Sequence, residues 1–178
     1  MGKSQYIIQF GGLPVGIHEF EFEVGDKFFK NDDLTQASEV QKAKLYVKAI
    51  LTKQNNLLQL EFAINGTVGI ECDRCLKDFD YPIETSEKLV VKFGDPEESN
   101  DEILVIKEGD AEFDVAHYIY EYIILAIPPR KVPCEIDEEQ FICDEETLKK
   151  LENISSDSEK KKDPINPMWE QLKKLKQN

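Results

Sequence analysis

Hydrophobic and polar residues alternate along the first two thirds of the chain with a period of two, as in a strand that buries one face. In residues 18–24, phenylalanine and valine lie on one face and glutamate lies on the other. Residues 40–51 and 57–64 alternate in the same way on either side of a polar turn, which predicts an antiparallel hairpin. Further strand-like runs cover residues 66–72, 81–93 and 103–106.

Apolar spacings of three and four residues, which are typical of helices, begin only near Asp114. Asp114 can cap a helix that ends at two consecutive prolines, and the apolar side of this helix should cover the sheet. A second, largely exposed helix is predicted over residues 144–153. Residues 168–178 predict a basic helix too short to be stable alone, so its apolar stripe must dock on another surface; this stripe consists of Met168, Trp169, Leu172 and Leu175.

These elements predict an α+β fold, in which a helix over residues 114–127 covers a curved antiparallel sheet or partial β-barrel. The chain has 178 residues, 40% of them hydrophobic, and can therefore form one domain with a substantial core. We expect this domain over residues 1–152, a flexible linker over residues 153–167 and the short tail helix. No signal-peptide pattern and no apolar run of membrane-spanning length is found, so we expect a cytoplasmic protein with reduced thiols and no membrane partner.

The formal net charge of −14 is concentrated in the middle of the chain. Residues 95–146 contain 17 acidic and 3 basic side chains, so this segment alone has a net charge of −14. An acidic field repels phosphate backbones and attracts basic proteins, which favours a basic partner. The alternative explanation is that the acidic segments only keep the protein soluble.

The C-x-x-C motif formed by Cys72 and Cys75 is the best candidate for a chemical site, because a tight turn can bring both sulfur atoms to one metal ion. Cys134 and Cys143, with eight residues between them, are further candidate ligands, and zinc is the expected ion. A redox role would require the motif at the start of a helix, whereas the preceding residues are strand-like. Metal binding, redox chemistry and thiols that only hold a turn are three open alternatives.

Other catalytic patterns are weak. The sequence has no glycine-rich phosphate loop and no serine in a nucleophile elbow. Acidic pairs are abundant, but in so acidic a chain they carry little information. We therefore do not expect an enzyme, and a C-x-x-C oxidoreductase is the one enzymatic alternative.

Three motifs occur in a characteristic order. They are Glu-Cys-Asp-Arg-Cys-Leu at residues 71–76, the segment from Asp114 through Ile127 and Pro128 that leads to Cys134, and Pro-Met-Trp at residues 167–169 with Leu172 and Leu175. Together they resemble the bacterial large ribosomal RNA subunit accumulation proteins, a family long described as a domain of unknown function. The resemblance spans roughly residues 10–175. It implies a non-enzymatic cytoplasmic protein that is needed for normal amounts of 23S ribosomal RNA, with relatives in plant organelles.

The chain departs from this family at two places. Many relatives carry a second close cysteine pair, whereas residues 141–146 keep only Cys143 and are otherwise rich in acidic side chains. Met168 stands where an arginine before the tryptophan is common. The first departure weakens the case for a metal site, and the second affects how the tail would contact RNA or protein.

The resemblance and the charge pattern lead to two binding hypotheses. In the first, the protein holds a basic large-subunit ribosomal protein until it meets RNA, with carboxylates in place of phosphates. The expected surface consists of Glu97, Glu98, Asp101, Glu102, Glu108, Glu112, Glu135, Asp137, Glu138 and Glu139, with Trp169 as a further contact. In the second hypothesis, the protein binds 23S RNA directly through a basic strand face, which consists of Lys42, Lys44, Tyr46, Lys48 and Arg74.

Overall fold

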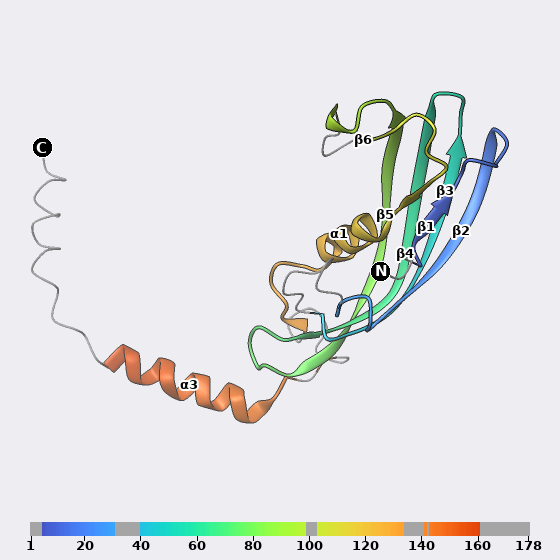
Figure 1. The fold of residues 1–178 in the computed structure, drawn as a ribbon. Coiled ribbons are helices and arrows are strands. Elements are labelled where there is room, and N and C mark those ends of the chain that lie inside the picture. Colours follow the sequence, from blue (N-terminus) through green and yellow to red (C-terminus); the bar gives the residue numbers. More distant parts are fainter. Residues whose placement is uncertain (1–4, 31–39, 99–102, 134–140, 142, 161–178) are drawn as a thin grey trace, which may run out of the picture.

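A five-stranded sheet forms most of the domain (Figure 1). The structure is a computed structural model that describes residues 5–30, 40–98, 103–133, 141 and 143–160, with side chains for all of these except residues 98 and 155–160. The strands lie in the order β2-β3-β4-β5-β6. Their bounds are Gly16–Gly25 for β2, Lys42–Lys53 for β3, Leu57–Glu71 for β4, Asp78–Phe93 for β5 and Ile103–Ile106 for β6.

The strands β2 to β5 pair antiparallel, and the predicted hairpin of β3 and β4 is confirmed. The two runs predicted at residues 57–64 and 66–72 form one continuous strand, β4. Gly66 joins them with a φ of 146°, and a Cβ atom at this position would lie 2.2 Å from the Lys44 carbonyl oxygen. Only glycine permits this conformation and this close approach of β3 to β4.

The last strand, β6, pairs with β5 in parallel, so the sheet is mixed, and it is not closed into a barrel. The predicted α+β class with a curved sheet is confirmed (Figure 1). Because β5 and β6 are parallel, both end at the same edge of the sheet. Residues 94–98 and 107–110 therefore leave the sheet side by side, and the Gly94 N–H donates a hydrogen bond to the Ile106 carbonyl (2.9 Å).

The predicted helix after Asp114 is confirmed as α1 (Ala116–Ala126), which lies against one face of the curved sheet (Figure 1). The Asp114 carboxylate accepts a hydrogen bond from the Ala116 N–H (2.8 Å) and so satisfies one donor at the helix start. Ile119 and Ile123 of α1 are fully buried in the same core as the inner side chains of β3 and β4. The helix ends before the two prolines, as expected from their missing N–H groups.

The N-terminal segment completes the core through a second, two-stranded sheet of β1 (Ile7–Gln9) and β7 (Glu112–Asp114). Lys53 of β3 holds the loop that follows β1. Its ammonium donates hydrogen bonds to the carbonyl oxygens of Phe10 and Leu13, both at 2.8 Å. The loop is thereby tied to the end of the central hairpin.

The second predicted helix is α3 (Glu145–Lys160), which starts beside the β4–β5 turn and extends away from the sheet (Figure 1). Asp144 caps it by accepting hydrogen bonds from the Thr147 N–H (2.9 Å) and hydroxyl (2.6 Å). The helix continues to residue 160, within the segment that was expected to be a linker. The predicted tail helix, with Trp169, lies outside the described residues. No helix in the described part of the chain is long and apolar enough to cross a membrane.

Candidate metal centre and charged surfaces

The turn between β4 and β5 brings Cys72 and Cys75 together. The Cys72 N–H donates a hydrogen bond to the Lys77 carbonyl (3.0 Å), and the Leu76 N–H donates one to the Cys72 carbonyl (2.9 Å). Leu76 has a φ of 59°, in the left-handed region that leucine rarely adopts. Its side chain is 65% exposed, so little burial compensates for the strain. The turn is therefore kept in a conformation that the sequence itself disfavours.

Residues 130–133 close over this turn and are held there by Asp73. The Asp73 N–H donates a hydrogen bond to the Lys131 carbonyl (2.9 Å), and the Asp73 carboxylate accepts one from the Lys131 N–H (2.7 Å). The Lys131 ammonium adds an ion pair at 3.4 Å. The hydrogen bond from the Lys131 N–H is the main reason why the pKa of Asp73 lies below its usual value.

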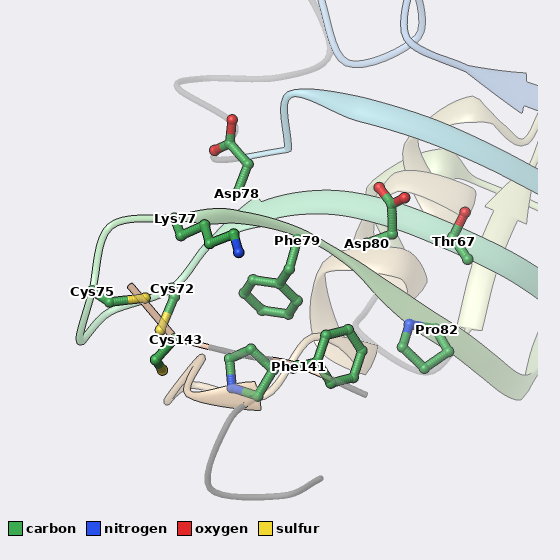
Figure 2. A pocket seen from close by; sticks show the side chains of 11 residues that line it. Thr67, Cys72, Cys75, Lys77, Asp78, Phe79, Asp80, Pro82, Phe141 and Cys143 are labelled. Carbon is green, nitrogen blue, oxygen red and sulfur yellow. The ribbon is translucent and has the colours of Figure 1, made fainter. Parts of the chain in front are cut away.

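Cys143 approaches the same turn from the segment before α3 (Figure 2). The Sγ atoms of Cys72, Cys75 and Cys143 all lie within 4.8 Å of one another. Cys72 and Cys75 are free thiols that are only 2% and 5% exposed. Cys143 is half-buried and disulfide-bonded, so it can ligate a metal only after reduction, because the ligand is the thiolate.

Hydrogen bonds favour ionisation of the Cys75 thiol. Burial acts against ionisation and by itself raises the pKa of Cys75. The pKa is nevertheless lowered, because the backbone N–H groups of Asp144 and Lys77 donate hydrogen bonds to the sulfur. The Cys72 thiol contributes a further hydrogen bond. The sulfur of Cys75 thus receives donors from both segments that meet at this site.

A pocket of about 440 Å³ opens beside the three cysteines (Figure 2). Phe79 and Phe141 line it, with their ring centroids 5.7 Å apart in an edge-to-face arrangement. Asp78 and Asp80 of β5 add carboxylates to the lining. These residues were not among those predicted from the sequence, although an aromatic residue near each cysteine segment was a usable signal.

The surroundings of the cysteines fit metal binding better than redox chemistry. The C-x-x-C motif lies in a turn between two strands and not at the start of a helix. Both of its sulfur atoms are buried, whereas a thiol that attacks a substrate must be accessible. The structure brings three of the four candidate ligands together, and the fourth, Cys134, lies outside the described residues.

The strand lysines that were predicted to contact RNA lie on the outer face of β3, and this face is charge-balanced. The neighbouring strand β2 places Glu21 and Glu23 on the same face, directly opposite Lys48 and Tyr46. Lys48 also forms an ion pair with Glu19 at 2.8 Å. Contact with RNA stays a prediction. Its residues lie on β3 (Lys42, Lys44, Tyr46 and Lys48) and on the turn of residues 72–77 between β4 and β5, which we call the thiol turn (Arg74).

The acidic segment of residues 95–146 contributes carboxylates to two ends of the sheet. Asp95, Glu97, Glu108 and Asp110 are exposed at the edge where β5 and β6 end, and we call these four residues the acidic end. Of these four, Glu97 and Glu108 belong to the surface predicted from the sequence, and whether that surface binds a partner stays a prediction. Asp144 instead lies beside the thiols, near the start of β5. The 16 residues of β5 separate the two regions by roughly 50 Å of extended strand.

The remaining predicted contacts are spread further. Glu98 belongs to the short helix η1 (Pro96–Glu98), next to the acidic end. Glu112 lies in β7, where Gln9 donates a hydrogen bond to its carboxylate (3.2 Å). The other members lie outside the described residues: Asp101, Glu102, Glu135, Asp137, Glu138 and Glu139.

Comparison with known proteins places these features in a family. The protein YlbN of Bacillus subtilis (strain 168), which is described as uncharacterized, is 29% identical over 171 residues, covering 95% of this chain and 94% of YlbN. No solved structure matches. The family profile described as large ribosomal RNA subunit accumulation protein YceD matches residues 60–176, a range that contains the thiol turn, both ends of β5 and α1. Because this match covers more than half of the chain, the protein belongs to the large ribosomal RNA subunit accumulation protein YceD family.

Proposed function

We propose that this protein supports the accumulation of large-subunit ribosomal RNA by binding a basic large-subunit ribosomal protein, without catalysing a reaction. Family membership supports the role in RNA accumulation. The charge distribution supports the kind of partner, because the net charge is −14 and lies within residues 95–146. The observation that carries the proposal is the acidic end, where parallel pairing of two strands gathers carboxylates at one edge.

The acidic end is exposed and largely uncompensated. Asp95 and Glu97 come from the loop after β5. Glu108 and Asp110 come from the loop after β6, in which Lys107 is the only cation. None of the four carboxylates forms an ion pair with another residue in the described part of the chain. Such an edge attracts lysine and arginine side chains over roughly 10 Å at 0.1 M salt.

A basic ribosomal protein needs counter-charges until it meets RNA. Carboxylates can hold its lysines and arginines by charge-assisted hydrogen bonds, as phosphates do in the ribosome. Attraction through exposed charges also speeds association. The basic partner is released readily when RNA, a stronger polyanion, competes for the same lysine and arginine side chains. The acidic end can therefore protect the partner and still deliver it.

Direct binding of 23S RNA is the second candidate. It is favoured by Tyr46, which is 55% exposed between Lys44 and Lys48 and could stack on a base. The ion pair of Lys48 with Glu19 and the other glutamates of β2 reduce the attraction of this face for phosphate. We therefore prefer the basic protein as partner.

The binding proposal is tested with individually purified large-subunit ribosomal proteins. A triple variant, Asp95→Asn with Glu97→Gln and Glu108→Gln, removes three of the four negative charges of the acidic end. The matched control is Glu19→Gln with Glu21→Gln and Glu23→Gln, which changes the net charge by the same amount on the outer face of β2. We expect a salt-sensitive complex that the first variant weakens at least about tenfold, or roughly 1.4 kcal/mol, and the control weakens little. Equal effects of both variants, or binding that is insensitive to salt, would contradict the proposal.

The role in the cell is tested by depleting the protein in its own host and quantifying 23S and 16S RNA separately. We expect 23S RNA to fall selectively, and the wild type and the β2 control to restore it. The acidic-end variant should restore it poorly. A 23S to 16S ratio that does not change on depletion would refute the role itself, whereas full rescue by the acidic-end variant would refute only the proposed surface.

A further inference from the structure

We propose that the reduced protein binds one Zn²⁺ ion through the sulfur atoms of Cys72, Cys75 and Cys143, and that this ion fastens the β4–β5 turn to the segment that begins α3. The inference does not depend on the proposed ribosomal partner. It rests on the position of the three sulfur atoms, on the hydrogen bonds around them and on the small size of the core in which they lie.

The sulfur positions are already close to those of a zinc site. Thiolates about 2.3 Å from a tetrahedral zinc ion hold their sulfur atoms roughly 3.8 Å apart. The three sulfur atoms here lie within 4.8 Å of one another, so shifts of about 1 Å or less would bring them to this spacing. Reduction of Cys143 frees its side chain to rotate toward this spacing.

The backbone around the cysteines provides the donors that stabilise a coordinated thiolate. The N–H groups of Lys77 and Asp144 donate hydrogen bonds to the sulfur of Cys75. One donor comes from the β4–β5 turn and the other from the segment that begins α3. Partners of this kind hold a metal ligand in place and tune its affinity. The left-handed conformation of Leu76 gives the turn the curvature that allows both cysteines to face one point.

The cysteines form a separate small core that needs an additional link. Cys72, Cys75 and Val132 are buried together, with Phe79, Cys143 and Leu148 packed around them, apart from the main hydrophobic core. Three buried residues contribute little apolar burial, and small cores are commonly stabilised by a metal or a disulfide. A zinc ion would join residues that are 71 positions apart in the sequence, Cys72 and Cys143.

The ligand chemistry selects the metal. Three soft thiolates favour zinc over calcium or magnesium, which require oxygen ligands. Each thiol releases its proton to the buffer when its sulfur binds the ion, so zinc binding should be weaker at lower pH. The carboxylates of the pocket are not part of the sulfur cluster.

The test uses the full chain, freed of metal and kept reduced by a water-soluble phosphine under anaerobic conditions. Zn²⁺ is titrated against a chromogenic chelator, and Co²⁺ serves as a spectroscopic substitute. We expect one equivalent per chain and the charge-transfer absorption of thiolate-bound cobalt. Cys72→Ser, Cys75→Ser and Cys143→Ser should each lower the zinc affinity more than about a hundredfold, since loss of a mere supporting group already lowers it 10–100-fold.

Val132→Ala is the matched control, because it perturbs the same small core without removing a sulfur atom. It should keep one equivalent of zinc and the thiolate absorption. Circular dichroism identifies any variant that fails to fold. The zinc titration of the wild type tests the proposed stoichiometry by itself, even if every variant fails to fold. A reduced wild type that binds less than one equivalent, a cobalt spectrum without thiolate absorption, or unchanged affinity in the folded serine variants would overturn the inference.

Discussion

The close approach of β3 and β4 at Gly66 predicts that this glycine is indispensable. In Gly66→Ala, the new Cβ would lie 2.2 Å from the Lys44 carbonyl oxygen and 2.8 Å from the Leu45 Cα atom, and both are backbone atoms that cannot rotate away. The φ of 146° is also strained for alanine. Strain contributes roughly 1–3 kcal/mol and overpacking a further 1–3 kcal/mol. We therefore expect a loss of about 2–6 kcal/mol, out of a total stability of about 5–15 kcal/mol.

Two other glycines separate these contributions. Gly16 has the same φ of 146°, but no atom lies within 4 Å of the point that a Cβ would occupy. Gly16→Ala therefore measures strain alone, about 1–2 kcal/mol after the gain from a less flexible unfolded chain. Gly25 has no strained φ, and its nearest contact would be an ordinary 3.9 Å. Gly25→Ala should therefore change stability by less than about 0.5 kcal/mol.

The assay is equilibrium unfolding in urea, followed by circular dichroism of the reduced protein with a chelator present so that bound metal does not contribute. Gly25→Ala should be the most stable variant, Gly16→Ala should be less stable, and Gly66→Ala should be the least stable. In thermal unfolding of the same samples, Gly66→Ala should melt at a temperature roughly 10 °C lower than the wild type. If Gly66→Ala were no less stable than Gly16→Ala, the close approach of the two strands would be wrong. If all three variants matched the wild type, the assigned backbone conformations would also be wrong.

Three further predictions concern the thiol turn and the N-terminal loop. Leu76→Gly should stabilise the protein by up to about 1 kcal/mol in urea unfolding because it removes the left-handed strain, whereas Leu76→Ala keeps the strain and should show no gain. Lys53→Met should lower stability by about 2 kcal/mol, because two carbonyl oxygens lose a charged donor; an unchanged unfolding midpoint would refute this role. The pKa of Asp73 is lower in the folded state than in the unfolded state. The contribution of the Asp73 carboxylate to the free energy of unfolding is therefore complete above about pH 4 and is lost as the pH falls through the folded pKa. The free energy of unfolding should fall less steeply with decreasing pH in Asp73→Asn than in the wild type, and identical slopes would contradict this assignment.

The candidate sites show how far reasoning from the sequence could reach. The C-x-x-C spacing was enough to select Cys72 and Cys75, because two cysteines in one turn meet whatever the rest of the chain does. The proximity of Cys143 depends on how the segment before α3 folds back, and no local pattern encodes it. Phe79 and Phe141 were missed for the same reason, since each aromatic ring alone is ordinary and only the tertiary structure brings the two rings together at the pocket.

The strand face shows what reading one element by itself leaves out. Lys44 and Lys48 alternate with apolar residues, and the strand that contains them was correctly expected to show a basic face. Strand pairing then places Glu21 directly opposite Lys48, so the surface that a partner meets is nearly neutral. Charge along one strand is a property of sequence, whereas charge across a sheet is a property of register.

The sequence by itself determined the local structure of this protein: the alternating strands, the hairpin and the helix that follows Asp114. These features depend on side-chain period and on backbone preferences within a few residues. Only the tertiary structure decided that β6 runs parallel to β5, that the acidic segment is divided between two ends of the sheet, and that Cys143 meets the thiol turn. Those outcomes depend on contacts between residues far apart in the chain, whose free energies are set by packing of the whole domain and not by any single segment.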